Sequence, residues 1–358
     1  MPSLKEIKGR INSISSTLAI TSAMKMVAAA KLQKAQMAIQ NMLPYERRLY
    51  SMLLDLMGAM NISAAASEDG SVRGSGSAER GFDQSGDRLS LSNRHDLAGM
   101  DGAYSLMAQR EVRKVAIVAF ASNSSLCGAF NSNAIREATA VINEYRASGL
   151  GDADITVYSV GRKMAEAMKK LGFPSPADFT KMSDSPSYDA ASALAQELFD
   201  GFVSGRFDKV ELVYNHYKST SSQPTTRQTY LPLSLADATA DIQVGKITDS
   251  ASESDTNRGA ESVGAPVVRQ GSPTTEDLIV EPSKEELIVT LLPKVVRLRV
   301  FTTLLDSTAA EHAARTVAMQ LATDNGNDLL QELTLEYNKG RQQKITSEIL
   351  DLVGGSMQ

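Results

Sequence analysis

The sequence predicts an α/β protein in which a long antiparallel coiled coil of the N- and C-terminal helices carries an inserted α/β domain. Two stretches, 3–57 and 284–353, have the periodicity of long amphipathic helices. The middle of the chain instead alternates strand-like and helix-like segments. A long amphipathic helix cannot bury its apolar seam on itself, so two such helices at opposite ends of one chain are expected to pair.

Residues 1–60 are predicted to form the N-terminal coiled-coil helix. Seam residues follow alternating spacings of three and four, which keeps them on one side of a helix. A helix of this span would be about 80 Å long. Pro44 is expected to kink it or to lie where a neighbour relieves the lost hydrogen bond. The seam is Leu4, Ile7, Ile11, Ile14, Leu18, Thr21, Lys25, Ala28, Leu32, Ala35, Ile39, Met42, Glu46, Leu49, Leu53 and Leu56.

Small residues and one charge interrupt this seam between Thr21 and Ala30. Small residues let helices approach closely, and Lys25 on a seam indicates either an outside partner or control of register. A locally loose coiled coil is the other interpretation. The helix is also cationic within an acidic chain, which fits a solvated face or an acidic surface beside it.

Two stretches without periodicity are rich in Ser, Gly, Asp and Thr. Residues 61–110 are predicted to be a low-complexity insert, and the histidine there, His95, is expected to be solvated. Residues 235–283 are predicted to be a flexible insert that ends in an edge strand, Asp277–Val280.

Between the inserts, residues 111–234 are predicted to form a Rossmann-like α/β domain. Strand-like segments are separated by helix-length crossovers, which implies a mostly parallel sheet. The expected strands are Lys114–Phe120, Asp154–Val160, Lys209–Tyr217 and Thr225–Leu231. The expected helices are Asn131–Arg146, Arg162–Leu171 and Tyr188–Val203.

Residues 284–358 are predicted to form the C-terminal coiled-coil helix. The segment Ala322–Gly326 (Ala-Thr-Asp-Asn-Gly) would normally end a helix, so the pattern leaves a helix–turn–helix open. The predicted apolar positions are Leu287, Leu291, Leu298, Phe301, Leu305, Met319, Ala322, Leu329, Leu333, Ile345, Ile349 and Leu352.

Composition limits the possible functions. A net charge of −5 argues against nucleic acid as the main partner. The single cysteine, Cys127, excludes an intrachain disulfide framework and suits a reducing compartment. No signal segment and no apolar run long enough to span a membrane are visible, so we expect a soluble or peripheral protein.

The most tempting chemical site is the turn Ser122–Asn131, which joins the first expected strand to its helix. Such turns direct backbone N–H groups at ligands, and Cys127 could act as a thiolate nucleophile there. The turn lacks the phosphate-loop pattern, the flanking glycines of a nucleophile elbow and any obvious histidine or metal-ligand spacing. We therefore expect a tight structural turn, no cofactor and no metal. His312 and Arg315 lie near the C-terminal seam, where an external protein surface is the favoured interpretation.

Several separated motifs resemble the γ subunit (central stalk, or rotor) of F-type ATP synthase. The resemblance covers both terminal helices and most of the middle, and its motifs occur in the family's order. These motifs are Ile20–Leu32, Ser125–Asn131 with the Leu-Cys-Gly turn, Gln228–Leu233, Glu311–Gly326 and Tyr337–Asp351. The two inserts have no matching counterpart.

The resemblance implies a rotor shaft inside a hexamer of α and β subunits, with the α/β domain at the foot beside the ε subunit and the c-ring. It favours a continuous C-terminal helix and implies no catalytic site in this chain. It also implies that Met24, Lys25, Arg315, Gln342 and Thr346 contact the hexamer. The foot contact to ε and the c-ring falls on Asp277, Leu278, Val280 and Glu281, where aliphatic residues replace the family's frequent aromatics.

Two alternatives remain at this stage. One is an α/β-domain enzyme that uses Cys127, with the helices as a dimerisation arm; the other is a coiled-coil adaptor with no motor role. For the rotor interpretation, the absence of a presequence favours the cytoplasmic face of a bacterial inner membrane, where the chain would be peripheral.

Overall fold

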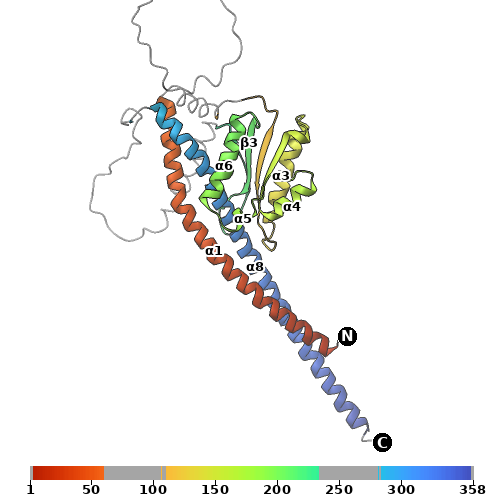
Figure 1. Cartoon of the computed structure of the whole chain (residues 1–358). Helices are drawn as coiled ribbons and strands as arrows, with labels where there is room; N and C mark the ends of the chain where they lie inside the picture. Colours follow the sequence, from red (N-terminus) through yellow and green to blue (C-terminus); the bar gives the residue numbers. More distant parts are fainter. Residues whose placement is uncertain (1–2, 60–105, 107–109, 234–280, 282–283, 356–358) are drawn as a thin grey trace, which may run out of the picture.

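The structure is a computed structural model, which describes residues 3–59, 106, 110–233, 281 and 284–355. Two long helices, α1 (Leu4–Ala59) and α8 (Lys284–Gly355), run side by side in opposite directions. An α/β domain lies against the half of this pair that contains the end of α1 and the start of α8 (Figure 1). The other half of the pair extends away from the domain as a free shaft, and the C-terminus reaches beyond the N-terminus.

The packing of α1 against α8 follows the predicted α1 seam. Each of the sixteen seam residues from Leu4 to Leu56 is buried or half-buried, which confirms that part of the prediction. Thr323 Oγ1 donates a hydrogen bond of 3.2 Å to Thr21 Oγ1 across the pair. Nearer the domain, an apolar cluster joins the helices through Leu32, Ala35, Ala309 and Ala313.

The predicted apolar face of α8 is correct only in its first half. Leu298, Leu305 and Met319 are buried, and Leu287, Leu291, Phe301 and Leu333 are half-buried. The prediction was wrong for the second half, because five of its positions are exposed: Ala322, Leu329, Ile345, Ile349 and Leu352.

The geometry of the pair explains this error. Beyond Met319 the less exposed residues include Thr323, Gly326, Leu330, Leu333 and Tyr337, so one row of the face toward α1 lies one residue after the predicted Ala322 and Leu329. Gly340 lies opposite Leu4, the first residue of α1. The remaining residues of α8, 341–355, therefore overhang the pair by about 22 Å.

Neither predicted interruption breaks a helix. Pro44 lies inside α1 and Pro293 inside α8. The segment Ala322–Gly326 also remains helical, so the helix–turn–helix possibility is wrong and α8 is continuous.

The α/β domain contains one four-stranded sheet in the order β2-β1-β3-β4. Strands β1 (Val115–Phe120), β2 (Ile155–Val160) and β3 (Lys209–Asn215) are parallel, and β4 (Thr225–Leu231) is antiparallel to β3. Each predicted strand is present within about two residues of its expected ends, the usual uncertainty of boundaries. The crossovers contain η2 (Asp152–Asp154) and helices α3 (Phe130–Ala147), α4 (Arg162–Lys170), α5 (Thr180–Asp184) and α6 (Tyr188–Val203).

Helices cover both faces of the sheet. On one face, α3 and α4 bury Ala134, Ala138 and Met164 against alternate residues of β1 and β2. On the other face, α6 contributes Leu194 and Leu198 and α8 contributes a row of large apolar residues. Tyr230 in β4 donates a hydrogen bond of 2.9 Å to the carbonyl of Val296. The first part of α8 is thus both a shaft helix and a layer of the domain core.

Some predicted features lie outside the described residues. These include the edge strand Asp277–Val280 and nearly all of both inserts, 61–110 and 235–283. Within the described part of the chain, no helix is both long and apolar enough to cross a membrane.

Candidate interface on the helical shaft

The carboxyl edge of the parallel strands is where open α/β sheets bind ligands. In this protein α8 runs across that edge. Ala310 and Ala314 of α8 pack with Cys127 and Phe130 from the turn after β1, and with Tyr217 from the loop after β3. The position of a small ligand is therefore filled by the chain's own helix.

Cys127 lies beneath this contact and is 1% exposed. Its Sγ accepts a hydrogen bond of 3.1 Å from Asn131 Nδ2 and lies 3.8 Å from Ser122 Oγ. Leu126 and Gly128 have positive φ values of 68° and 60°, as a tight reversal requires. A cysteine nucleophile must reach its substrate, and this thiol is enclosed by α8. Cys127 is therefore part of the packing between this turn and α8.

Arg315 is directed into the molecule, with its side chain 15% exposed. Its guanidinium donates to the carbonyl of Ser125 at 2.6 Å and to Ser124 Oγ at 2.9 Å. Glu311, one helical turn earlier, accepts a third hydrogen bond at 2.7 Å. This intramolecular arrangement differs from the outward-facing side chain expected from the sequence, because the guanidinium is held by the turn after β1.

The neighbours of Arg315 have perturbed acid–base behaviour. Burial raises the pKa of Glu311, although the hydrogen bond from Arg315 opposes the shift. Burial lowers the pKa of His312 to about 4, and the positive charges of Lys31 and Arg315 act in the same direction. His312 Nδ1 is buried and has no hydrogen-bond partner among the described residues. His312 is therefore a neutral, packed side chain near neutral pH.

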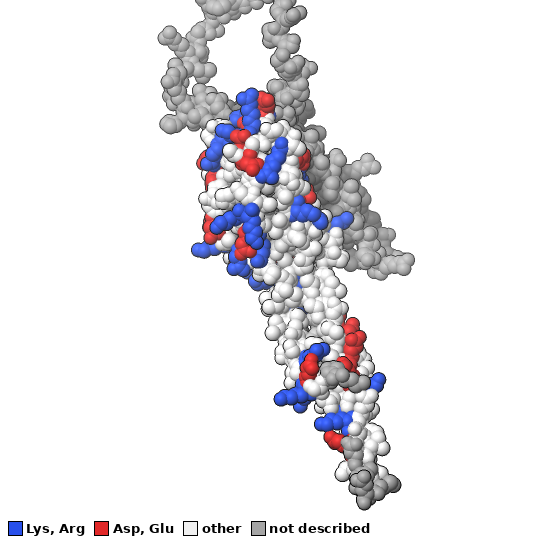
Figure 2. Space-filling view, turned by 90° about the vertical axis from the view of Figure 1, so that its right-hand side faces the viewer, with Lys and Arg blue, Asp and Glu red and all other residues white. Residues whose placement is uncertain are grey.

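Just beyond the domain, the shaft exposes apolar side chains. Ile20, Met24 and Val27 recur at spacings of four and three on one face of α1, and they are 56%, 42% and 58% exposed. Leu321 of α8 is 58% exposed. We call these four residues the apolar collar. Lys25 beside them is half-buried. Figure 2 shows few charged side chains on this part of the shaft, and α1 has none between Arg10 and Lys25.

The overhang of α8 is a second exposed surface. Gln342 and Thr346 are both exposed, and Thr346 Oγ1 donates to the carbonyl of Gln342 at 2.9 Å. Apolar side chains are exposed beside them, at Ile345, Ile349, Leu350, Leu352 and Val353. Contiguous exposed apolar surface of this kind marks a site of protein association.

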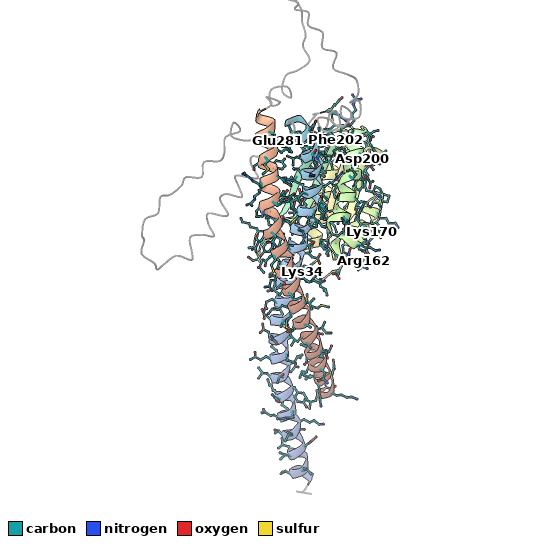
Figure 3. The ribbon with its side chains drawn as sticks, turned by 60° about the vertical axis from the view of Figure 1, so that its left-hand side comes forward. Lys34, Arg162, Lys170, Asp200, Phe202 and Glu281 are labelled. Atoms are coloured by element: carbon teal, nitrogen blue, oxygen red, sulfur yellow. The ribbon has the colours of Figure 1, made fainter. Side chains whose placement is uncertain are left out.

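Of the four residues expected at the foot contact, the structure describes Glu281. Glu281 is exposed at the domain end of the shaft, whereas Lys34 lies on α1 at the other end of the domain (Figure 3). Asp277, Leu278 and Val280 lie outside the described residues.

Sequence reasoning missed one group of contacts between the domain and the shaft. Asp306 of α8 accepts hydrogen bonds from the loop after β3, at His216 and Tyr217, and Gln36 of α1 bonds to Tyr217. The available signal was Asp306 itself, an acidic residue that follows the largely apolar run Val300–Leu305. Its partners are about 90 residues away in sequence and could not be inferred from any local pattern.

Within the described residues, no cluster of three or more His, Cys, Asp or Glu side chains could hold a metal ion. A covered sheet edge, a buried cysteine and two exposed apolar surfaces on a shaft define the class of protein. These features are those of a mixed α/β protein whose N- and C-terminal helices form an exposed shaft.

Comparisons with known proteins identify the family. The ATP synthase family model matches residues 3–357. The ATP synthase gamma chain of Phocaeicola vulgatus is 47% identical over 357 residues, and that of Bacteroides thetaiotaomicron is 45% identical over 358 residues. Both alignments cover 100% of each chain. This chain belongs to the ATP synthase gamma chain family.

A solved structure has the same fold at low sequence identity. It is a chain of the Euglena gracilis mitochondrial ATP synthase, from the OSCP/F1/c-ring assembly in rotational state 3. The TM-score is 0.52 at 19% identity, with 99% of this chain and 93% of that chain covered.

Proposed function

We propose that this chain is the central-stalk rotor of a proton-translocating F-type ATP synthase. In this role α1 and α8 form a coiled-coil shaft within a hexamer of α and β subunits, and the α/β domain lies at the foot. The observation that carries the proposal is the apolar surface left unpartnered on the shaft of a chain whose whole length matches the gamma chain family. The hexamer would cover that surface.

The mechanism requires no catalytic group in this chain. Proton flow turns the c-ring and the foot, and the shaft then presents a different face to each β subunit in turn. Each orientation favours a different β conformation and therefore a different nucleotide affinity. Stiffness and asymmetry are what the shaft must supply. The pairing of α1 with α8 supports stiffness, and the placement of Ile20, Met24 and Val27 on one face of α1 supports asymmetry.

The proposed hexamer contacts lie at two levels of the shaft. Met24 and Lys25 act at the apolar collar, and Gln342 and Thr346 act on the overhang. The exposure of Met24, Gln342 and Thr346 supports this assignment. Arg315 belongs to the first level, and it would act there by holding the Ser124–Ser125 turn at the surface.

The proposed foot contacts are Asp277, Leu278, Val280 and Glu281, against the ε subunit and the c-ring. We divide the chain functionally into a shaft (1–60 and 284–358), a foot domain (111–234) and two inserts (61–110 and 235–283). The chain would then be peripheral, held on the cytoplasmic face of a bacterial inner membrane through the c-ring. Its bacterial relatives support that location.

Co-expression with α and β subunits tests the proposal. A complex isolated through a tag on β should contain one copy of this chain for every three β subunits, and its steady ATPase activity should depend on this chain. A chain that stays free in solution would favour a non-motor adaptor. Turnover by the isolated chain that is lost in Cys127→Ser would favour an enzyme.

A further inference from the structure

The contact between α8 and the α/β domain changes character near Leu305. Before this point, large apolar side chains of α8 are buried in the domain core: Ile288, Leu292, Val295, Val296, Val300 and Leu304. After it, the α8 members of the two small apolar clusters that join it to α1 and to the domain are alanines: Ala309, Ala310, Ala313 and Ala314.

This change matters for how firmly the domain holds the shaft. Large interdigitated side chains fix the position of one element on another. Alanines offer a smooth surface, and apolar contact has no preferred direction. Hydrogen bonds do have a preferred direction and distance. Along the alanine segment, polar contacts are therefore the ones best able to hold the domain at a fixed angle to the shaft.

The first polar contact is made by Asp306, whose side chain is 17% exposed. Its Oδ1 accepts a hydrogen bond of 2.9 Å from the backbone N–H of Tyr217, and its Oδ2 lies 2.6 Å from His216 Nδ1. Gln36 Nε2 of α1 donates a hydrogen bond of 2.6 Å to the Tyr217 hydroxyl. One loop of the domain is thus bonded to both shaft helices.

The second polar contact is the Arg315 guanidinium on the turn after β1, described above. Glu311 orients this guanidinium from one turn earlier in α8. The two contacts are nine residues apart on α8, so they are separated by about 14 Å along the helix axis. Two points separated along the axis resist tilting of the domain against the shaft, and each of them also opposes rotation about it.

Both contacts fall at one place in the sheet. The Ser124–Ser125 turn follows β1, and the His216–Tyr217 loop follows β3, its parallel neighbour. The connections from β1 lead to β2 on one side, whereas β3 lies on the other side. This is the switch point, where an open α/β sheet forms its ligand crevice. In this protein α8 of the shaft occupies the position of that crevice.

We propose that Asp306 and Arg315 are positioning residues that lock the α/β domain to the shaft at the switch point of the sheet. Rotation of the domain is then transmitted to the apolar collar without relative movement between the domain and the shaft. This inference rests on the proposed rotor function, because it concerns how the rotor transmits torque.

The test uses the assembled complex with α, β and ε subunits and the c-ring. Asp306→Ala removes both hydrogen bonds, whereas Asp306→Asn keeps an acceptor for Tyr217 and removes the charge. Asp152→Ala is the matched control, because it breaks an ion pair of 2.6 Å with Arg146 that lies wholly within the domain.

A bead attached through Lys170→Cys on α4 reports the angle of the domain relative to the immobilised hexamer (Figure 3). Cys127 is buried and should not be labelled.

Loss of the Asp306 contact should increase the angular variance of the bead during pauses above that of the wild type, since mean-square displacement reports the stiffness of a joint. Protons pumped per ATP hydrolysed should fall in Asp306→Ala, fall less in Asp306→Asn and stay at the wild-type value in Asp152→Ala. A merely structural role would lower the yield of complex or its melting temperature and leave both quantities unchanged in each assembled molecule.

The outcomes separate the two proposals. Failure of the wild-type bead to rotate on addition of ATP would overturn the rotor function itself. A rotating wild type, with Asp306→Ala equal to it in variance and proton ratio, would overturn only the positioning role. If Asp306→Ala does not assemble, the comparison of Asp306→Asn with the wild type and with Asp152→Ala decides, because Asp306→Asn keeps an acceptor for Tyr217.

Discussion

Gly326 of α8 lies directly against Leu18 of α1. A Cβ atom at Gly326 would come within 2.6 Å of Leu18 Cδ2, closer than such atoms approach each other. The glycine therefore sits at a point of close approach between the two helices, and the surrounding helical contacts outweigh its low helix propensity. This explains why the Asp-Asn-Gly sequence does not end α8.

Replacing Gly326 with leucine should force the two helices apart. Overpacking of this kind costs about 1–3 kcal/mol, and the melting temperature should fall accordingly. Adding Leu18→Ala to Gly326→Leu should restore part of the loss, because it removes the side chain that clashes. Calorimetry of the single and double variants measures the effect. Equal melting temperatures for Gly326→Leu and the wild type would contradict this packing.

Gly9 is the matched control, since a Cβ atom there would meet nothing within 4 Å. Gly9→Ala should stabilise α1 by up to about 1 kcal/mol through helix propensity alone. Gly326→Ala gains the same propensity but must displace a Leu18 methyl group, so its melting temperature should stay below that of Gly9→Ala.

His312 should make the protein less stable in mild acid. Its pKa is about 4 in the folded chain and 6.5 in the reference state, so the unfolded chain binds the additional proton between these values. Stability therefore decreases as the pH falls from 6.5 toward 4. His312→Asn should flatten the dependence of melting temperature on pH across this window. A variant with the same slope as the wild type would show that His312 is not the titrating group.

Glu211 is the centre of a charged network in the sheet. It is 1% exposed and bonds to Tyr145, Arg227 and Lys209. Burial alone would raise its pKa, but the hydrogen bonds from these partners together outweigh burial and hold the pKa below 4.5. The stability that this carboxylate contributes is present above pH 4.5 and is lost as the pH falls through the lower folded value.

Glu211→Gln should destabilise the domain by about 3 kcal/mol at neutral pH, because it leaves Lys209 without its carboxylate and Arg227 with only the exposed Glu144. The free energy of unfolding of Glu211→Gln should also depend less on pH in the acid range than that of the wild type. Glu144→Gln is the control: Glu144 also pairs with Arg227, but its side chain is 65% exposed, so a change below about 1 kcal/mol is expected. Denaturant titrations at two pH values compare the variants, and similar losses for both would argue against a buried network.

Met24→Lys should lower the coupling of the assembled complex. Met24 is 42% exposed in the apolar collar beside Lys25. A second positive charge there would let the shaft hold one β conformation too strongly, which opposes the shift between states. Proton pumping per ATP hydrolysed is the measurement. An unchanged ratio would remove Met24 from the proposed contact.

Local pattern was sufficient for most of the fold. Strand runs such as Val115–Phe120 are buried on both faces and read as continuous apolar segments. The α1 seam was also predictable, because a partner helix covers its whole length. Ile345 and Ile349 could not be predicted as exposed, because the sequence does not show that α1 ends before it reaches them.

The candidate site was predictable where it depends on exposure along a helix and unpredictable where it depends on tertiary contact. Met24 lies in the stretch of α1, Thr21–Ala30, where small residues interrupt the seam. The inward direction of Arg315 depends on a turn 190 residues away. The partners of Asp306 depend likewise on where the sheet lies against α8.

Rotation of a bead on Lys170→Cys, with the α and β subunits immobilised, tests the central claim most directly. The account predicts that ATP drives the bead in one direction, with three equivalent pauses per turn that reflect the three β subunits. A bead that only fluctuates about one angle while the same complexes hydrolyse ATP would contradict the account, because this chain would then be a fixed part of the assembly.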